Sequence, residues 1–571
     1  MALNLCISLA QLNPLVGDLE GNSRQVLAAA RQAAAAGVQV LVTPELALWG
    51  YPPRDLLLLP SLLRRQQKVL DALAQALPED LRVLVGVVAP LADEGGSLLH
   101  NSAALVGDGA WRVVAAKRLL PSYDVFDERR YFRPGSQPCL VEIPLAGRPL
   151  RLAVTICEDL WADPRRPCQP AYDCDPVAEL APLAPDVMVN LSASPFAMGK
   201  QTLRRELATA AAARLGCPVA YVNQVGGNDE LVFDGNSFVV DPQGAVVLQL
   251  PSARPATHWV HLALPQGLAA PPAGSPMAVT SPQEELWKVL VLGLGDYACK
   301  CGFRAAVLGL SGGVDSALVA CLAAAALGPR QLRGLLMPSP FSSPGSVADA
   351  RELAQRLGMA TTTVPITPLM DTFAQALHHA LGKDPGGVAA ENLQSRIRGT
   401  LLMALANQEE RLLLSTGNKS ELAVGYCTLY GDMNGGLAVI GDLYKTDVYR
   451  LCRWLNSPAA QQQRHAAGLP TRGPLIPEVI LSKPPSAELH PSQKDSDSLP
   501  DYAILDPILK RLVEQHDTPD QLIAAGDDPA LVQSIWSLLR RAEFKRRQAP
   551  PVLKVSGRAF GTGWRMPIAT C

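Results

Sequence analysis

The sequence predicts an α/β protein with two domains, and three observations support this. Its 571 residues exceed what one ordinary hydrophobic core accommodates. Short β-rich runs alternate with helical patterns in both halves of the chain, which is typical of parallel sheets covered by helices. A segment rich in Pro, Ala and Gly without hydrophobic periodicity separates the halves. We therefore expect domains at residues 1–265 and 283–571, joined by a linker at 266–282.

The expected elements follow from hydrophobic periodicity. In the first half we expect a helix at 23–36, with Ser23 as N-cap and Gly37 as its stop. In the second half, helices are expected at 316–327 and 346–357, and a mobile loop at 483–500. The predicted strands of both halves are residues 81–88, 151–156, 186–190, 238–240, 305–310, 332–337, 361–366 and 411–416.

Composition excludes several classes of protein. A formal net charge of −2, without a dominant block of Lys or Arg, argues against nucleic-acid and membrane-surface partners. The N-terminus lacks the pattern of a signal peptide, and no apolar helical stretch is long enough to span a bilayer. The twelve cysteines form no CxxC pair and the eight histidines form no zinc-binding array. These features predict a reducing cytoplasm with mostly free thiols.

The sharpest motif is SGGVDS at 311–316, between a predicted strand and a predicted helix. Its glycines allow a tight turn that exposes main-chain N–H groups, and the helix N-terminus adds a favourable dipole. These features predict a phosphate-binding turn. It is not a Walker loop, because the GxxxxGK[ST] pattern is absent.

The motif resembles the pyrophosphate loop of the ATP pyrophosphatases. That resemblance implies a doubly wound parallel sheet, of the adenine nucleotide alpha hydrolase-like kind, and cleavage of ATP between its α and β phosphates. GMP synthetase, asparagine synthetase and tRNA thiolases share the loop, so the loop alone leaves the substrate open.

Flanking segments narrow the choice. ENLQSRIRG at 391–399, STGNKSELAVGY at 415–426 and AEFKRRQAPP at 542–551 together resemble the NAD synthetase family from about residue 281 onward. The resemblance implies deamido-NAD contacts from Asn392, Glu421 and Lys545, and a Mg²⁺ ion held by Asp315 and Glu421, whose carboxylates suit that ion. The ATP contacts that it implies are Gly309, Leu310, Ser311, Gly312, Gly313, Val314, Asp315, Ser316 and Thr416.

Two positions depart from that family's pattern. Residues 486–500 resemble its lid loop, which usually carries an acidic residue where Ser496 stands. In GTGWR at 561–565, Trp564 replaces a residue that is commonly basic. These departures bear on local contacts.

The first half offers a different chemistry. Glu45 follows a predicted strand, Lys117 lies in AAKRLLPSYDVFDERRYF at 115–132, and Cys157 ends a strand in TICEDLW at 155–161. A thiol attacks as thiolate, a carboxylate can take its proton, and an ammonium can stabilise the negative charge on the attacked carbonyl. Together the three residue types predict amide hydrolysis without histidine.

These segments, in this order, resemble the carbon–nitrogen hydrolase (nitrilase) family, and most closely the glutaminase domain of glutamine-dependent NAD synthetases. The resemblance implies an αββα sandwich with Glu45 as general base, Lys117 as oxyanion helper and Cys157 as nucleophile. Glu128 is expected to be a supporting carboxylate. Tyr123, Ser194 and Lys200 are expected to hold glutamine. Related enzymes often have Arg at the last position, so the Lys200 contact would be single rather than bidentate.

The two resemblances together predict an ATP-dependent ligase that amidates deamido-NAD with ammonia from glutamine, passed through an internal tunnel. They also imply a homo-oligomer. Three alternatives remain at this point. The acceptor could be another carboxylate or a nucleobase; the chain could modify nucleic acid, since tRNA thiolases share the loop; or the first half could be an inactive docking module.

Overall fold

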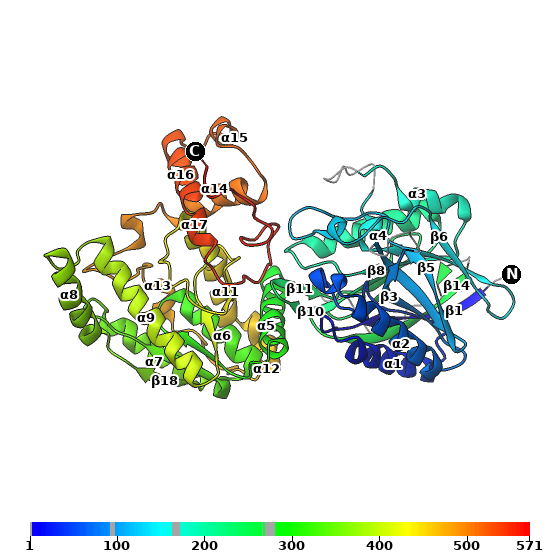
Figure 1. Ribbon diagram of the computed structural model, residues 1–571, viewed down its shortest axis with the longest axis horizontal. Coiled ribbons are helices and arrows are strands. Elements are labelled where there is room, and N and C mark those ends of the chain that lie inside the picture. Colours follow the sequence, from blue (N-terminus) through cyan, green and yellow to red (C-terminus); the bar gives the residue numbers. More distant parts are fainter. Residues whose placement is uncertain (1–2, 92–97, 163–171, 265–266, 269–279, 571) are drawn as a thin grey trace. The chain divides into compact units, whose positions relative to one another are not determined.

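The computed structural model describes residues 3–91, 98–162, 172–264, 267–268 and 280–570. The chain divides into two compact units, Met1–Thr280 and Ser281–Cys571, each with its own sheets (Figure 1). The predicted linker at 266–282 lies mostly outside the described residues, so the domain limits stay a prediction. Within the described ranges, every helix is too short or too polar to cross a bilayer.

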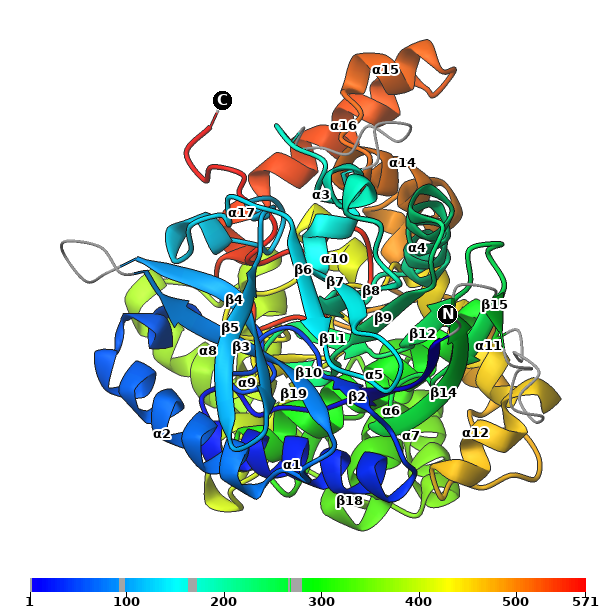
Figure 2. The same cartoon turned by 90° about the vertical axis from the view of Figure 1, so that its right-hand side faces the viewer.

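The first unit contains two large sheets (Figure 2). One has seven strands in the order β15-β14-β1-β2-β3-β4-β5, and the other has six in the order β13-β12-β9-β8-β7-β6. Their strands are β1 (Leu3–Gln11), β2 (Val40–Val42), β3 (Arg82–Pro90), β4 (Leu99–Gly107), β5 (Ala110–Ala116), β6 (Cys139–Ile143), β7 (Leu150–Ile156), β8 (Val187–Ser192), β9 (Val219–Asn223), β12 (Phe238–Val240), β13 (Val246–Gln249), β14 (Ala256–Leu264) and β15 (Gly267–Leu268); β10 (Val225–Asn228) and β11 (Leu231–Asp234) form a separate hairpin.

Successive side chains along each strand face opposite sides of the sheet, and this alternation separates the layers of the first unit. In β1, Leu5 and Ile7 face a core shared with the other sheet, while Cys6 and Ala10 face the helices outside. The helices α1 (Leu19–Ala35) and α2 (Pro60–Ala76) cover the seven-stranded sheet, and α3 (Pro176–Leu180) and α4 (Lys200–Leu215) cover the six-stranded sheet. The predicted αββα sandwich is confirmed.

The predicted start of the first helix is wrong by four residues. α1 begins at Leu19, and the Asp18 carboxylate caps it by accepting the Gly21 N–H, so Ser23 lies inside the helix. Leu19 is fully buried. Burial of this side chain and the Asp18 cap favour the longer helix.

The second unit is built on one parallel sheet in the order β18-β17-β16-β19-β20. Its strands are β16 (Ala306–Gly309), β17 (Leu332–Leu336), β18 (Ala360–Thr363), β19 (Leu412–Ser415) and β20 (Leu437–Ala438). Its helices are α5 (Pro282–Lys300), α6 (Val314–Leu327), α7 (Pro344–Leu357), α8 (Thr367–Leu381), α9 (Val388–Gln408), α10 (Lys419–Val424), α11 (Lys445–Asn456), α12 (Gln461–Ala466), α13 (Glu478–Ser482), α14 (Tyr502–Glu514), α15 (Pro519–Ala524), α16 (Pro529–Arg541) and α17 (Glu543–Arg546).

The strand order of this sheet predicts where a ligand-binding crevice lies. From β16 the chain moves outward through α6 and α7 to β18, and then returns through α9 to β19 on the other side of β16. Right-handed crossovers in opposite directions put α6 and α9 on opposite faces of the sheet. The strand order therefore reverses between β16 and β19, and ligands of doubly wound sheets bind at the carboxyl ends of such strands.

The eight predicted strands correspond to observed strands whose ends shift by at most three residues. The largest shift is at the strand predicted for 361–366, which ends at Thr363, because Pro365 has no N–H to continue the ladder. The helix predicted at 316–327 begins two residues earlier, at Val314, so the helix already starts inside the glycine motif.

A buried ionic cluster joins the C-terminal segment of the second unit to α10. The Lys419 ammonium lies 2.9 Å from Asp442 and 2.8 Å from Glu514. Asp442 also accepts the Val555 and Ser556 N–H groups. Because α10 carries Glu421, this cluster supports the wall of the crevice.

Replacing Asp442 by Ala should destabilise the second unit by about 3–5 kcal/mol, because the buried Lys419 charge loses a partner. Calorimetry of the full chain should show the corresponding transition lowered by about 10 °C. The control is Glu352→Ala, which breaks an exposed ion pair with Arg356 and should cost about 0.5 kcal/mol. A shift no larger than the control would contradict the role of the cluster.

Candidate active sites

Glu45 lies just after β2, where several main-chain and side-chain donors converge. Its Oε1 accepts the Asn101 Nδ2–H at 2.7 Å, and its Oε2 accepts the Ala193 N–H at 2.9 Å. Gly86 on β3 lets this backbone approach closely, because a Cβ there would lie 2.3 Å from the Pro44 oxygen. The carboxylate is therefore held rigidly by both sheets of the first unit.

Lys117 follows β5, and its ammonium lies between two carboxylates. Nζ is 2.7 Å from Glu45 Oε1 and 2.7 Å from Glu128 Oε1, and the side chain is 1% exposed. Burial lowers the pKa of Lys117, but the two carboxylates raise it well above its ordinary value. The lysine therefore stays charged. Burial raises the pKa of Glu128 to about 7, with Lys117 opposing and Glu45 adding to the rise.

Cys157 begins the turn Cys157–Leu160 directly after β7. Its φ of 45° is unusual for a residue with a side chain, and strain of this kind is common at reactive positions. Burial raises the pKa of the thiol well above its ordinary value, the charge of Glu45 raises it further, and Lys117 opposes them. At neutral pH the thiol therefore keeps its proton until a base removes it.

Asp159 ties the turn of the nucleophile to the segment that follows the lysine. Its carboxylate accepts the Ile156 N–H at 3.0 Å, the Arg118 N–H at 2.9 Å and the Leu119 N–H at 2.8 Å. This residue was not predicted, because its role is visible only when the two segments meet in space.

The predicted glutamine-binding residues lie around the same turn. The Tyr123 hydroxyl donates to Glu158 Oε1 at 2.9 Å, and the Tyr172 hydroxyl donates to the same oxygen at 2.7 Å. The Lys200 ammonium lies 5.3 Å from the centre of the Trp161 ring. Ser194 is 2% exposed and follows Ala193, the donor to Glu45. Glu158 and Tyr172 are additions that the sequence reasoning missed.

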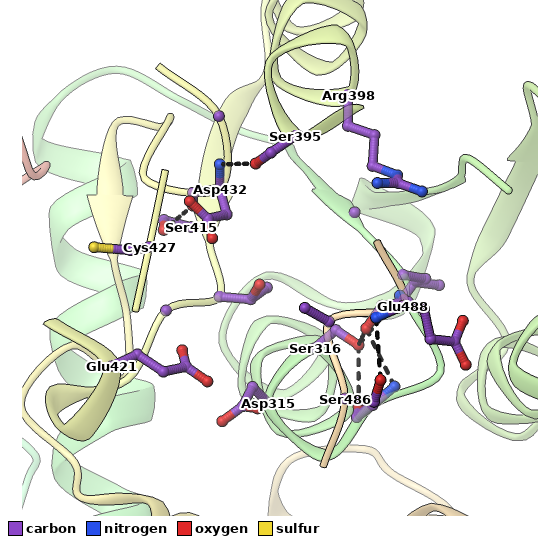
Figure 3. A pocket seen from close by; sticks show the side chains of 18 of the residues that line it. Asp315, Ser316, Ser395, Arg398, Ser415, Glu421, Cys427, Asp432, Ser486 and Glu488 are labelled. Carbon is purple, nitrogen blue, oxygen red and sulfur yellow. Dashed lines mark hydrogen bonds between the residues drawn. The ribbon is translucent and has the colours of Figure 1, made fainter. Parts of the chain in front are cut away.

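The second unit has a pocket of about 330 Å³ at the strand-order reversal (Figure 3). The predicted ATP contacts that line it are Gly309, Leu310, Ser311, Gly313, Val314, Asp315, Ser316 and Thr416. Gly312 lies behind the lining; its φ is 76°, and a Cβ there would lie 2.2 Å from the Ser346 oxygen. The turn is closed by the Ser316 hydroxyl, which donates to the Gly313 oxygen at 3.1 Å.

Two carboxylates in this pocket share one ammonium. Lys445 Nζ lies 2.5 Å from Asp315 Oδ2 and 3.2 Å from Glu421 Oε1. The Asn418 side chain donates to Asp315 at 3.0 Å, and its oxygen accepts the Glu421 N–H at 3.0 Å. Burial raises the pKa of Glu421 to about 7, with Lys445 opposing and Asp315 adding to the rise. Lys445 was not among the residues predicted from the sequence. Its segment, GDLYKTDVY at 441–449, is the sequence feature that could have pointed to it.

Asn392 and Lys545 lie behind the pocket wall rather than in its lining. Asn392 accepts the Thr428 hydroxyl at 2.8 Å, and the Lys545 ammonium donates to the Gly425 and Cys427 oxygens at 2.7 and 2.8 Å. Cys427 lines the pocket. In the described structure both residues therefore brace the wall segment 425–428.

Comparison with known proteins identifies the family of each half of the chain. Residues 6–265 match the family model of carbon-nitrogen hydrolases, and residues 286–549 match that of NAD synthases. The glutamine-dependent NAD(+) synthetase of Synechocystis sp. is 50% identical over 568 residues, which cover 99% of this chain and 98% of that protein. The chain belongs to the glutamine-dependent NAD(+) synthetase family.

Two further relatives extend the match. The glutamine-dependent NAD(+) synthetase of Thermotoga maritima is 41% identical over 99% of this chain and 98% of its own. A solved structure of the Acinetobacter baumannii enzyme in complex with ADP is 36% identical, with a TM-score of 0.76 and coverage of 99% and 98%. The predicted fold class, family and C–N ligase class are confirmed, and these relatives do not favour a different acceptor.

The two departures from the family pattern have local explanations. Ser496 is exposed, but its neighbour Asp495 is buried, lines the pocket and accepts the Tyr502 hydroxyl at 3.0 Å. An acidic group therefore still faces the pocket from this loop. Trp564 is buried, and its Nε1–H donates to Glu543 at 2.8 Å. The Arg546 and Arg558 guanidinium groups lie 5.8 and 5.2 Å from its ring centre.

The loop predicted at 483–500 forms one side of the pocket (Figure 3). Glu488 accepts the Ser346 hydroxyl at 2.7 Å and the Ser343 N–H at 3.3 Å, at the N-terminus of α7. Its mobility stays a prediction. The contacts place the loop beside the glycine turn, where phosphates are expected.

Replacing Gly312 by Ala should lower ATP-dependent activity at least about 100-fold, because the side chain would clash with the Ser346 oxygen and strain a left-handed residue. Steady-state pyrophosphate release measures the loss. Glutamine hydrolysis should remain. Gly345→Ala is the control, since a Cβ there would lie 3.8 Å from the Ser343 hydroxyl. Equal losses in both variants would count against the predicted phosphate turn.

The raised pKa of Glu128, about 7, predicts a pH profile. Below pH 7 the carboxyl gains a proton and Lys117 then binds Glu45 more tightly, which weakens Glu45 as a base. The value of kcat/KM for glutamine hydrolysis should fall about tenfold per pH unit below 7 and level off above about 8. In Glu128→Gln the inflection near 7 should disappear. If the inflection near pH 7 is unchanged in that variant, the inflection belongs to another titrating group.

Proposed function

We propose that this chain makes NAD from deamido-NAD, ATP and glutamine. One observation carries the proposal: a buried ammonium between two carboxylates, electrostatically coupled to a strained cysteine, occurs in the same chain as a pocket lined by a glycine turn. The first arrangement suits amide hydrolysis, and the second suits activation of a carboxylate by ATP. The family of the chain supports the pairing.

In the first step, Cys157 Sγ attacks the side-chain amide carbon of glutamine while Glu45 takes the thiol proton. The Lys117 ammonium stabilises the oxyanion. Glu45 then returns the proton to the leaving nitrogen, and ammonia departs. The remaining glutamyl thioester is hydrolysed to glutamate, which regenerates the thiol.

Glutamine would be held by its amino acid end. The Ser194 hydroxyl and the Lys200 ammonium suit its α-carboxylate, and Tyr123 would complete the pocket. Glu158, which already accepts the Tyr123 and Tyr172 hydroxyls, suits the α-ammonium group.

In the second unit, the nicotinate carboxylate attacks the α-phosphorus of ATP and pyrophosphate leaves. Ammonia then displaces AMP from the acyl-adenylate, giving the amide. The ADP complex of the Acinetobacter baumannii relative supports nucleotide binding at this fold. The turn at 311–316 and Thr416 would hold ATP, while Asn392, Glu421 and Lys545 would place the deamido dinucleotide at the wall they support.

The donor set also fits Mg²⁺. Asp315 and Glu421 already hold a cationic group between them, the Lys445 ammonium, so their oxygens form an arrangement that accepts positive charge. These two carboxylates would hold the ion, which would neutralise phosphate charge when bound. Lys445 would then be available for a phosphate oxygen.

The two predicted domains, at 1–265 and 283–571, are coupled in this proposal. Ammonium is no nucleophile, so neutral ammonia would have to reach the acyl-adenylate before bulk water protonates it. We further propose a homo-oligomer, which sedimentation would test. A cytoplasmic site of action suits the ten free cysteines in the described part of the chain.

Replacing Cys157 by Ala should abolish glutamine-driven synthesis of NAD but leave ammonia-driven synthesis within about twofold of the parent, because the thiol acts only in ammonia release. The assay combines deamido-NAD, ATP and Mg²⁺ with either glutamine or ammonium chloride and identifies the product. Cys217→Ala, at another buried cysteine of the first unit, is the control. Equal loss of both activities in a folded variant would refute this division of labour.

A further inference from the structure

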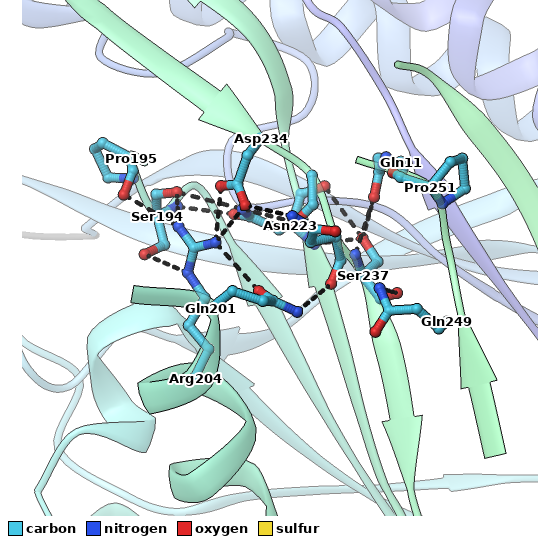
Figure 4. Close-up of polar contacts among 12 residues, drawn as sticks. Gln11, Ser194, Pro195, Gln201, Arg204, Asn223, Asp234, Ser237, Gln249 and Pro251 are labelled. Atoms are coloured by element: carbon cyan, nitrogen blue, oxygen red, sulfur yellow. Dashed lines mark hydrogen bonds and ion pairs between the residues drawn. The ribbon is translucent and has the colours of Figure 1, made fainter. Parts of the chain in front are cut away.

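Ser194 is held by a buried arginine on α4 (Figure 4). Arg204 Nε donates to Ser194 Oγ at 3.3 Å. One Nη donates to the main-chain oxygens of Ser194, at 2.7 Å, and Pro195, at 3.0 Å. Asn223 accepts the Ser194 N–H at 2.9 Å. The hydroxyl and both main-chain polar groups of Ser194 are thus bound by side chains from two other elements.

Arg204 is itself held by a buried carboxylate. Its other Nη lies 2.7 Å from Asp234 Oδ1 at the end of β11, and neither side chain is more than 1% exposed. A guanidinium in this position cannot bind a ligand directly, because its donors are already used within the protein. Its chemical effect must therefore pass through Ser194.

That effect biases how Ser194 meets a ligand. The Arg204 Nε–H occupies one of the two acceptor lone pairs of the Ser194 hydroxyl, and the guanidinium charge makes the remaining O–H a better donor. This O–H suits an acceptor such as a carboxylate. Lys200 lies one helical turn before Arg204 on α4, and therefore on the same side of the helix. The carboxylate of an amino acid would meet a hydroxyl donor and an ammonium from this region.

We infer that Arg204 is a positioning residue for substrate recognition, which fixes Ser194 as a hydrogen-bond donor to the α-carboxylate of glutamine. The inference rests on the proposed glutaminase activity and adds to it a source of selectivity for free amino acids. Simple amides, which lack the α-carboxylate, gain nothing from this arrangement.

The test compares two reagents that alkylate Cys157. The glutamine analogue 6-diazo-5-oxo-L-norleucine carries the α-carboxylate, and iodoacetamide does not. In Arg204→Lys, which keeps a positive charge beside Asp234, the analogue should inactivate about tenfold more slowly, while the iodoacetamide rate stays unchanged. KM for glutamine should rise about tenfold with kcat within about twofold. Equal slowing of both reagents, or a fall in kcat alone, would overturn the inference.

Two further measurements keep the outcome unambiguous. Ser194→Ala combined with Arg204→Lys should be no worse than Ser194→Ala alone, because the arginine acts through the serine; additive losses would overturn the inference. The iodoacetamide rate reports the folding of the first unit around Cys157, and ammonia-driven synthesis reports that of the second unit; both should be unchanged in each variant. If Ser194→Ala leaves KM for glutamine unchanged, the inference about Arg204 fails while the proposed function stands. If the parent protein does not hydrolyse glutamine, the proposed function fails first.

Discussion

The first unit depends on the pairing of one buried ammonium with two buried carboxylates. Lys117 can stay charged in an apolar interior only because Glu45 and Glu128 lie 2.7 Å away on separate segments. Each partner is in turn held by other donors: Glu45 by Asn101 and Ala193, and Glu128 by Tyr51. Loss of Lys117 would leave two buried carboxylates without a counter-charge, so strands of both sheets are constrained by a single electrostatic requirement.

The second unit repeats the arrangement of one lysine and two acids, but its carboxylates are more exposed to solvent. Lys445 is 4% exposed, but the side chains of Asp315 and Glu421 are 18% and 19% exposed toward the pocket. Water and ligands can therefore compete for these carboxylates, whereas the carboxylates around Lys117 are almost closed off. The same three groups make a closed cluster in one unit and a solvent-accessible cluster in the other.

Sequence alone predicted the parts of the fold that repeat locally. Alternating runs predicted the strands, and the glycine turn between β16 and α6 lies in the lining of the pocket of the second unit. The start of α1 was missed because a buried Leu19 and the Asp18 cap outweighed the helix signal at Ser23. Asp159 and Arg204 could not be predicted, since their contacts exist only once separate segments meet in the folded chain. Lys445 was missed although its segment at 441–449 offered a signal. The roles of the predicted site residues stay predictions, although Glu45, Lys117 and Cys157 are electrostatically coupled in the structure.

Asp159 has a consequence for how this pocket can change. Its carboxylate joins the main chain before Cys157 to the main chain after Lys117. The spacing of thiol and ammonium is thus inherited from the backbone, and the segment that follows Leu119 returns Glu128 to the same lysine. Between these two anchors, Ser122 and Asp127 are exposed and can change without touching either anchor. Redesign of the entrance therefore has its freedom at such exposed positions, between two fixed ends.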